Sequence, residues 1–445
     1  MNKVKIKYFK NSCLYGELLK DNNWFIFLDS CNDVGSFGKY DILTCNPYMT
    51  ILSKGNSITI NENGVNSHIK DNPFDIIKKY FNVNSDITDL PFSSGMIGYF
   101  GYDALNNIES DGGFPDIAVG FYDWAIIVDH EKKESNLVFK KTNYFIENII
   151  NKIKSINTLI KDSKDYFFSN FRQTTSKDKY IKDISRIKNY ITNGDCYQVN
   201  YSQNFTAEYF GNPWDIYKNI RIINPAPYSS FISFNERYVI SSSPERFISV
   251  NENMVETKPI KGTMKRLKDH NLDQKQIDIL KHDEKNISEN LMIVDLLRND
   301  LSKCCELGTV KVSKLFDIES YASVHHMVST INGKLNPEST SISILEACFP
   351  GGSITGAPKK RSMEIISELE NRKRDVYCGS IGYFNENNNM DTNICIRTIM
   401  MYKGKLNFAA GGGIVYDSIP EDEYNESLDK VSIFIDFFSN GEFKW

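Results

Sequence analysis

SPERFISVNENMVETKPIKGT, residues 243–263, is the stretch that decides the fold. Two strand-like runs flank the turn-forming residues Asn251–Asn253, which predicts a β-hairpin and therefore antiparallel pairing. With the turn centred near Glu252, Glu245 lies opposite Pro259, and Lys261 follows two residues along the partner strand. A diagonal pair of that kind is about 7–8 Å apart between backbones, so an acid and an amine come within reach of one ligand.

The rest of the chain mixes strand and helix signals. Residues 1–130 are strand-rich, because short apolar runs bounded by turn residues predict strands there at Trp24–Leu28, Met49–Leu52 and Phe121–Val128. Residues 131–178 are polar and predict a crossover segment with helical character from Tyr144. Residues 179–445 carry the clearest helices, and no strict βαβ alternation is present. The pattern predicts an α+β fold with largely antiparallel sheets.

Three amphipathic helices are predicted in the C-terminal region. Apolar residues recur at helical spacing over Tyr180–Ile191 and over Asn286–Asn299. The last helix has the clearest stripe, which is stopped by Asn440-Gly441 and consists of Tyr424, Leu428, Val431, Ile435 and Phe438.

The composition is that of a globular protein. The 445-residue chain is 41% hydrophobic with a net charge of −5, so it lacks the basic excess that a nucleic-acid-binding protein needs. No apolar run is long enough to cross a membrane, and no apolar signal segment is visible, so membrane insertion and export are not expected. The nine cysteines include no CxxC pair, which is typical of reduced thiols in a cytoplasmic protein.

Lys261 and Glu245 form the first candidate site. An amine attacks only when it is unprotonated, and burial together with the nearby charges of Lys258, Lys265 and Arg266 is expected to favour the neutral form. Glu245 suits the complementary role of a general acid that protonates a leaving hydroxyl. Taken alone, the two residues also fit a solvated strand-end lysine and a surface acid, so the pattern by itself leaves both interpretations open.

Two glycine-rich segments are candidate anion sites. Phe349–Arg361 runs from a glycine loop into a helix, where free N–H groups together with Thr355 and Lys359 would bind a carboxylate or phosphate. The alternative is a glycine turn that only reverses the chain. Three further glycines in succession let backbone N–H groups converge on an anion, namely Gly411, Gly412 and Gly413.

Charged residues on predicted elements add a cation and a metal site. Arg397 lies within an apolar strand-like run, and a buried arginine needs an anionic partner such as a carboxylate. Glu423 and Glu426 share one face of the last helix and Glu289 lies on an earlier helix, so the two helices together would hold Mg²⁺ beside a substrate carboxylate. The same spacing also fits a solvated helix face. The pair His325-His326 fits either catalysis or packing.

Together these segments resemble the chorismate-utilising family, which includes anthranilate, isochorismate and salicylate synthases and the enzymes that form aminodeoxychorismate. The resemblance covers about residues 176–438, and its motifs follow family order: GDCYQVN (194–200), NPAPY (224–228), SPERF (243–247), PIKGT (259–263), ENLMIVDLLRND (289–300), the glycine loop 349–359, GSIGY (379–383) and AGGGI (410–414). It implies a two-part fold with large antiparallel sheets surrounded by helices.

Within the family, Lys261 distinguishes the activities. Anthranilate synthases typically carry PIAGT where this chain has PIKGT, so the resemblance favours the enzymes that form aminodeoxychorismate. It implies that Lys261 attacks C2 of chorismate while the 4-hydroxyl leaves with help from Glu245, and that ammonia then attacks C4 and displaces the lysine. Anthranilate synthase is the rival of the same class. A non-catalytic amino-acid-binding subunit is the rival of another class, and it would be expected to lose Lys261, Glu245 or the metal acids.

The resemblance also implies roles for the other candidates. Glu289 and Glu426 match Mg²⁺ ligands, and Glu423 matches an acid beside them. His326, and not His325, matches an active-site histidine. Contacts to the substrate carboxylates are expected from Thr355, Tyr383, Arg397 and the run Gly411–Gly413. In some relatives the N-terminal half binds tryptophan between the sheets, and the candidate residues for such a site here are Ser30 and Pro227.

The source of ammonia is expected to lie outside this chain. None of the nine cysteines lies in a G-x-C-x-G turn, so the strained turn that exposes a glutaminase nucleophile is missing. Ammonia would then come from solution or from a separate glutamine amidotransferase subunit in a heterodimer.

Overall fold

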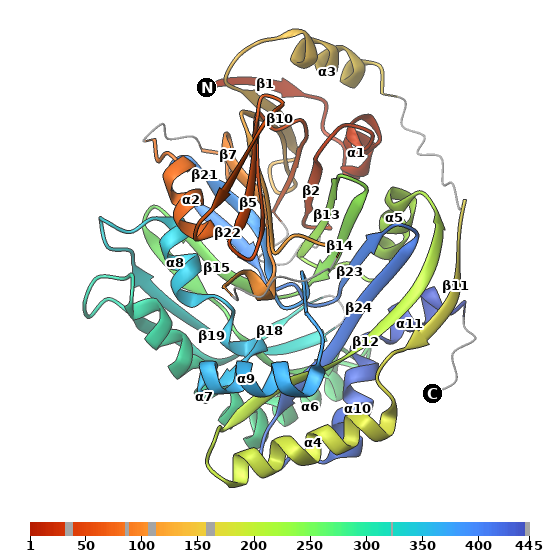
Figure 1. The fold of residues 1–445 in the computed structure, drawn as a ribbon, viewed down its shortest axis with the longest axis vertical. Helices are drawn as coiled ribbons and strands as arrows, with labels where there is room; N and C mark the ends of the chain where they lie inside the picture. Colours follow the sequence, from red (N-terminus) through yellow and green to blue (C-terminus); the bar gives the residue numbers. More distant parts are fainter. Residues whose placement is uncertain (32–38, 85–88, 106–112, 157–164, 322–323, 441–445) are drawn as a thin grey trace.

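Two large antiparallel sheets face each other through the middle of the molecule, and helices surround them (Figure 1). The structure is a computed structural model and describes residues 1–31, 39–84, 89–105, 113–156, 165–321 and 324–440. Over these ranges, no helix has both the length and the apolar character needed to cross a membrane.

The first sheet has twelve strands. Eleven of them follow one path, in the order β1 (Asn2–Ile6), β10 (Glu134–Phe139), β9 (Trp124–Asp129), β3 (Tyr40–Thr44), β2 (Phe25–Asp29), β13 (Tyr228–Phe234), β14 (Arg237–Ser243), β23 (Thr398–Tyr402), β24 (Lys405–Ile414), β12 (Gln198–Gly211) and β11 (Tyr166–Gln173). The twelfth, β20 (Gly356–Ala357), pairs with β12.

The second sheet also has twelve strands. Its path is β17 (Ile260–Lys265), β19 (Val324–Lys334), β16 (Met254–Thr257), β15 (Arg246–Asn251), β22 (Met390–Asn393), β21 (Ser380–Asn385), β7 (Gly95–Phe100), β8 (Ile117–Tyr122), β4 (Met49–Lys54), β5 (Ser57–Glu62) and β6 (Val65–Lys70). The remaining strand, β18 (Lys311–Ser320), pairs with β19.

Three apolar clusters hold these layers together. The cluster between the sheets takes residues from both, such as Ile97, Ile127 and Ile381, which are almost fully buried. A second packs the first sheet against α1 (Cys13–Leu19), α3 (Tyr144–Lys154), α4 (Lys177–Thr192), α5 (Pro213–Ile223), α9 (Lys359–Glu370), α10 (Pro420–Asp429) and α11 (Ser432–Phe438). The third packs the second sheet against α2 (Pro73–Tyr80), α7 (Glu284–Ser302) and α8 (Ser341–Cys348). Helix α6 (His270–Lys281) buries only Leu280.

Both sheets combine strands from the N-terminal and C-terminal parts of the chain. In the first sheet β2 pairs with β13, and in the second β7 pairs with β21. The regions before residue 130 and after residue 178 therefore share both sheets. The segment 131–178 contributes β10 and β11 near opposite edges of the first sheet, and the helix predicted there, α3, lies between these strands in sequence.

The predicted hairpin is confirmed as β15 and β16. Glu252 and Asn253 form its turn and both have positive φ, and Asn251 pairs with Met254. The predicted register is wrong in two respects. The turn centres between Glu252 and Asn253, one pairing step away from the predicted register, and the partner strand does not continue to Lys261. The chain leaves β16 at Thr257, and β17 pairs instead with β19.

Two apolar runs divide where one element was predicted. The run 121–128 belongs to two strands, β8 of the second sheet and β9 of the first, and the chain passes between the sheets at Asp123. The predicted last helix is two helices, α10 and α11, which are separated at Lys430 and Val431. All five residues of its predicted stripe are nevertheless buried. Of its predicted stop, Asn440 has positive φ, and Gly441 lies outside the described residues.

Candidate active site

A cavity of about 660 Å³ brings together segments from the whole C-terminal half of the chain. It is lined by Glu245 before β15, by Lys261 on β17, by His326 on β19 and by Glu289 on α7. Arg397 before β23, the three glycines of β24, and Glu423 and Glu426 on α10 complete this set. The structure therefore places most of the residues selected from the sequence around one space, which is called the main cavity below.

Lys261 enters the main cavity from a bulged strand. The pairing of β17 with β19 shifts register between Lys261 and Thr263. The Lys261 side chain is only 12% exposed, and its Nζ lies 3.6 Å from Oε2 of Glu289. The expected cationic surroundings are not found, since Lys258 forms its own ion pair with Glu319 (2.5 Å) and Arg266 is paired with a carboxylate on α6.

Gly262 allows α7 to approach this strand closely. Its φ of +74° belongs to the left-handed region, which favours glycine. A Cβ at this position would lie 2.7 Å from Leu280 and 2.9 Å from Asn286. The glycine of PIKGT therefore brings the start of α7, and with it Glu289, next to the lysine.

Glu245 is a buried acid that titrates near neutral pH. Burial raises its carboxyl pKa to about 7, although the Lys261 charge and a hydrogen bond from Ser353 act in the opposite direction. The Ser353 hydroxyl donates to Oε1 at 3.0 Å. The backbone is fixed as well, because the Ile394 N–H donates to the Glu245 carbonyl at 3.0 Å. A carboxyl of this pKa can both donate and accept a proton at physiological pH.

His326 is held neutral in the cavity wall. Burial and the nearby charge of Arg397 lower its pKa to about 4. Its Nδ1 lies 2.8 Å from the hydroxyl of Thr263. Successive side chains of a strand point to opposite faces, and His325 accordingly faces away and contacts Asp273 (2.9 Å). Of the two histidines, only His326 lines the main cavity as the structure describes it.

Arg397 is a largely buried cation without an anionic partner among the described residues. Its φ is +51°, and burial lowers the pKa of its guanidinium. None of the residues that the structure describes forms a hydrogen bond or ion pair with that guanidinium. Because an arginine is always charged in a protein, a carboxylate entering the main cavity would supply the missing anion.

The run Gly411–Gly413 was predicted to bind an anion through its backbone N–H groups, but its geometry is different. The three glycines lie in a regular strand, opposite Asn200, Tyr201 and Ser202 of β12, so their N–H groups do not form a converging anion nest. A Cβ on Gly412 would lie 3.3 Å from Nζ of Lys430 and 3.4 Å from Oε2 of Glu423. The absence of a side chain therefore leaves room in front of the acidic residues of α10.

Glu289 and Glu426 are the carboxylates that could hold a cation. Burial raises the pKa of Glu426, but the charge and hydrogen bond of Lys430 (2.7 Å) outweigh it and lower the pKa overall. Glu423 is occupied by Lys285 (3.1 Å) and by a hydroxyl, that of Ser418. Within the described part of the chain, no group of three or more His, Cys, Asp or Glu residues is arranged to hold a metal. A Mg²⁺ ion needs only one or two carboxylates when substrate oxygens and water complete its shell, so Glu289 and Glu426 fit such an ion.

Three residues expected in the site lie elsewhere. The Thr355 hydroxyl donates to the Gly351 carbonyl (2.9 Å) and closes the glycine loop. Lys359 pairs with Asp300 (2.6 Å) and does not line the main cavity. Tyr383 lines a different, second cavity.

The main cavity is also lined by residues that were not selected from the sequence. Among them are Ser353 and Ile354 of the glycine loop, Tyr377 before β21, Asn200 on β12 and Lys430 after α10. The side-chain oxygen of Asn200 is buried and has no hydrogen-bond partner within the described chain. Its position in the GDCYQVN motif was the available signal, because that motif was already assigned to the family pattern.

The second cavity, of about 100 Å³, contains the candidate tryptophan residues. Ser30 and Pro227 both line it, together with Tyr383 and two acids, Asp29 and Asp391. The structure therefore brings the two candidates together between β2, β13 and the β21–β22 hairpin. Tryptophan as its ligand stays a prediction.

Comparison with known proteins relates this geometry to a family. The family described as chorismate binding enzyme matches residues 26–436. Aminodeoxychorismate synthase component 1 of Escherichia coli strain K12 is 38% identical over 424 residues, which cover 92% of this chain and 92% of that protein. Anthranilate synthase component 1 of Acetivibrio thermocellus is 35% identical over 441 residues, which cover 93% and 89%. The crystal structure of anthranilate synthase component I from Streptococcus pneumoniae TIGR4 has a TM-score of 0.79 and 32% identity, and covers 88% of this chain and 91% of that one.

Proposed function

This chain belongs to the family of chorismate binding enzymes, and on that premise we propose that it converts chorismate and ammonia into 4-amino-4-deoxychorismate. The product is the precursor of 4-aminobenzoate in folate biosynthesis. The observation that carries the proposal is the position of Lys261, the distinguishing residue of PIKGT, inside the main cavity beside Glu245. The 38% identity to an aminodeoxychorismate synthase component 1 agrees with it.

The proposed reaction has two substitution steps. In the first, the Nζ of Lys261 forms a bond to C2 of chorismate while the bond between C4 and its hydroxyl breaks. Glu245 gives its proton to that hydroxyl, which leaves as water. In the second step ammonia forms a bond to C4, and the electrons of the bond between C2 and Nζ return to Lys261. Glu245 takes up the proton released by the new amine, so covalent catalysis replaces one difficult substitution with two easier ones.

Substrate charge explains the remaining residues. Chorismate is a dianion, and Arg397 offers a fork that matches one carboxylate. Glu289 and Glu426 would hold Mg²⁺, which would neutralise the other carboxylate. Binding of Glu289 to such an ion would also release Lys261 from its present contact with that carboxylate at 3.6 Å. Neutral His326 can donate or accept a hydrogen bond without adding charge to the site.

The proposed setting is a cytoplasmic heterodimer. Component 1 in the name of the E. coli relative agrees with a second subunit, and we propose that a glutamine amidotransferase supplies the ammonia. The nine cysteines are free thiols and all except Cys31 are buried, as expected for a protein of a reducing compartment.

Anthranilate synthesis is the second candidate, because relatives with that name are nearly as similar, at 35% identity. Incubation of the purified chain with chorismate, Mg²⁺ and ammonium, followed by product identification, separates the two activities. We expect 4-amino-4-deoxychorismate as the main product. Anthranilate or isochorismate as the main product would contradict the proposal, and binding of chorismate without turnover would favour a non-catalytic subunit.

A further inference from the structure

Arg374 is a fully buried charge that lines neither cavity. It is 1% exposed and lies four residues beyond Glu370, the last residue of α9. Its Nη2 and Nε donate to the two carboxylate oxygens of Glu370 at 2.6 and 3.1 Å. Burial raises the Glu370 pKa, but Arg374 and Arg372 outweigh this effect and lower it overall, so the carboxylate stays ionised.

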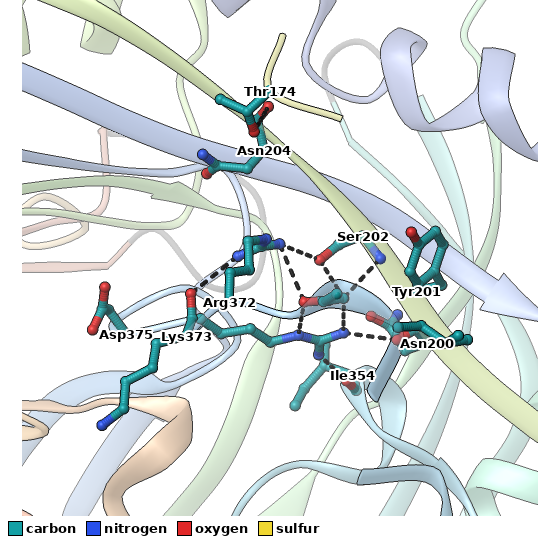
Figure 2. A network of polar contacts seen from close by, with 12 residues as sticks. Thr174, Asn200, Tyr201, Ser202, Asn204, Ile354, Arg372, Lys373 and Asp375 are labelled. Carbon is teal, nitrogen blue, oxygen red and sulfur yellow. Dashed lines mark hydrogen bonds and ion pairs between the residues drawn. The ribbon is translucent and has the colours of Figure 1, made fainter. Parts of the chain in front are cut away.

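The same guanidinium also donates hydrogen bonds to the backbone carbonyls of two residues in the main cavity wall. Its Nη1 donates to the Ile354 carbonyl at 2.9 Å and its Nη2 to the Asn200 carbonyl at 2.7 Å. Ile354 belongs to the glycine loop and Asn200 to β12, so one side chain connects two segments that are far apart in sequence. Figure 2 shows Ile354 and Asn200 next to this network.

Glu370 fixes a second residue of β12, two positions beyond Asn200. Its Oε1 accepts from both the N–H (2.9 Å) and the hydroxyl (2.7 Å) of Ser202. Arg372 also donates to the Ser202 hydroxyl, at 2.6 Å, as Figure 2 shows. The strand is therefore held at two positions by the same ion pair.

The flat face of Arg374 supports two aromatic rings. Its guanidinium carbon lies 4.7 Å from the ring centre of Tyr102 and 6.0 Å from that of Tyr377. Tyr377 lines the main cavity. The backbone N–H of Arg374 donates to Asp103 at 3.2 Å, which anchors the arginine to the N-terminal part of the chain.

We propose that Arg374, oriented by Glu370, is a positioning residue that fixes the main cavity wall formed by Asn200, Ile354 and Tyr377. Ile354 follows Ser353, whose hydroxyl donates to the general acid Glu245 at 3.0 Å. Loss of the hydrogen bond from Arg374 to the Ile354 carbonyl would let Ser353 and Glu245 move relative to Lys261. The guanidinium is suited to this task because its planar fork serves several acceptors at once, which an ammonium group cannot do.

The inference rests on the proposed function for the role of Glu245, but its test is independent of the product. The double variant Arg374→Met, Glu370→Gln removes both charges and keeps an amide oxygen for Ser202. Replacing a buried ion pair by uncharged groups is often tolerated in folding. We expect kcat for chorismate consumption to fall about 100-fold, the cost of misplacing reacting groups by about 1 Å. KM should change little, because the groups proposed to bind the substrate, Arg397 and the metal carboxylates Glu289 and Glu426, lie on other walls of the main cavity.

A matched control separates positioning from stability. Lys218 on α5 is also buried, at 8% exposure, and pairs with Glu17 of α1 (2.7 Å) and Asp215 of α5 (2.8 Å). It lines neither cavity. Lys218→Met should lower the melting temperature and leave kcat and KM per folded molecule unchanged.

The proposal is overturned if the double variant matches wild-type kcat per folded molecule. If that variant does not fold, Arg374→Lys decides the question, because it keeps the charge and loses the fork. Wild-type kcat in Arg374→Lys would overturn the proposal, and a lowered kcat with retained KM would support it. Product identity is measured separately in the wild-type protein, so a different product would contradict the proposed function without deciding the role of Arg374.

Discussion

The two cavities are lined by the same pair of sheets, but they differ in whether their buried charges have partners. Around the second cavity each acid has an arginine. Arg221 donates to Asp29 at 2.5 and 3.1 Å, and Arg246 donates to Asp391 at 3.0 and 2.8 Å. In the main cavity Arg397 has no anion within the described chain, and buried Glu245 has a raised pKa.

This difference indicates where a charged ligand belongs. An unpaired buried charge destabilises the fold, so its retention implies that a substrate supplies the missing partner. A charge that already has its partner contributes to the architecture and leaves little attraction for a ligand. The main cavity is therefore suited to an anionic ligand, and the second cavity to a ligand that does not require a free cation.

The largest expected effect comes from removing the amine of the main cavity. Lys261→Ala should lower amination at limiting ammonium on the order of 10³-fold or more, because no nucleophile remains to form the adduct. Lys265→Ala on the same strand is the matched control, since that side chain is exposed. Steady-state product formation measures both variants. Full activity in Lys261→Ala would show that catalysis is not covalent.

The next effect tests the unpaired acid. Glu245→Gln should lower kcat by about 10²–10⁴-fold, because an amide cannot protonate the leaving hydroxyl. Glu252→Gln, in the exposed turn of the same hairpin, should behave as the wild type.

Glu245 also makes a stability prediction with a definite sign. Its folded pKa of about 7 lies above the usual value for a glutamate, so the folded state binds this proton more tightly than the unfolded state. The resulting stabilisation is complete below about pH 4.3 and is lost as pH rises through about 7. Unfolding of wild type and Glu245→Gln at pH 5 and pH 8 should therefore show a relative gain in stability for the variant at pH 8. Parallel pH curves would contradict the assignment.

A pair of arginine variants tests the comparison of the cavities directly. Arg397→Met removes an unpaired buried charge, so it should raise the melting temperature while weakening chorismate binding by about 10–100-fold. Arg246→Met should instead lower the melting temperature, with little effect on chorismate binding. It leaves Asp391 and Glu256 without their cation, and breaking a buried pair costs about 3–5 kcal/mol. Thermal unfolding and chorismate titration measure both, and a stability loss of equal size in the two variants would refute the distinction.

The smallest expected effect on activity concerns Lys359. Because it pairs with Asp300 at 2.6 Å outside the main cavity, Lys359→Met should leave kcat/KM nearly unchanged and lower the free energy of unfolding. Lys360→Met, at the exposed neighbouring position, should alter neither. A large rise in KM for Lys359→Met would restore the anion-binding role predicted from the sequence.

The sequence predicts those parts of the site that depend on local order. Glu245 and Lys261 lie in short motifs flanked by turn residues and Arg397 lies in a short apolar run, and all three reach the main cavity. The hairpin turn at Glu252 and Asn253 is also local, because positive φ at two successive positions suits the twist of an antiparallel pair. Periodicity likewise identifies α4 and α7.

What the sequence does not predict depends on neighbours that are remote in the chain. Nothing within β17 indicates that β19 is its partner. Tyr377 and Tyr383 are only six residues apart, and only the packing of β21 against β7 and β22 shows that Tyr377 reaches the main cavity and Tyr383 the second one. The ion pair of Lys359 could not be predicted for the same reason, because its partner Asp300 belongs to α7, and nothing in the sequence of the glycine loop indicates that contact.

The interleaving of early and late strands has a consequence for synthesis of the protein. Strand β7 (Gly95–Phe100) receives its neighbour β21 (Ser380–Asn385) only after most of the chain has been made. Until then its backbone groups and apolar side chains have no partner on one side, and such open edges promote aggregation. Pairings this distant also slow folding. Nascent chains that stall before β21 are therefore expected to depend on chaperones, and only a nearly complete chain can leave the ribosome in its native form.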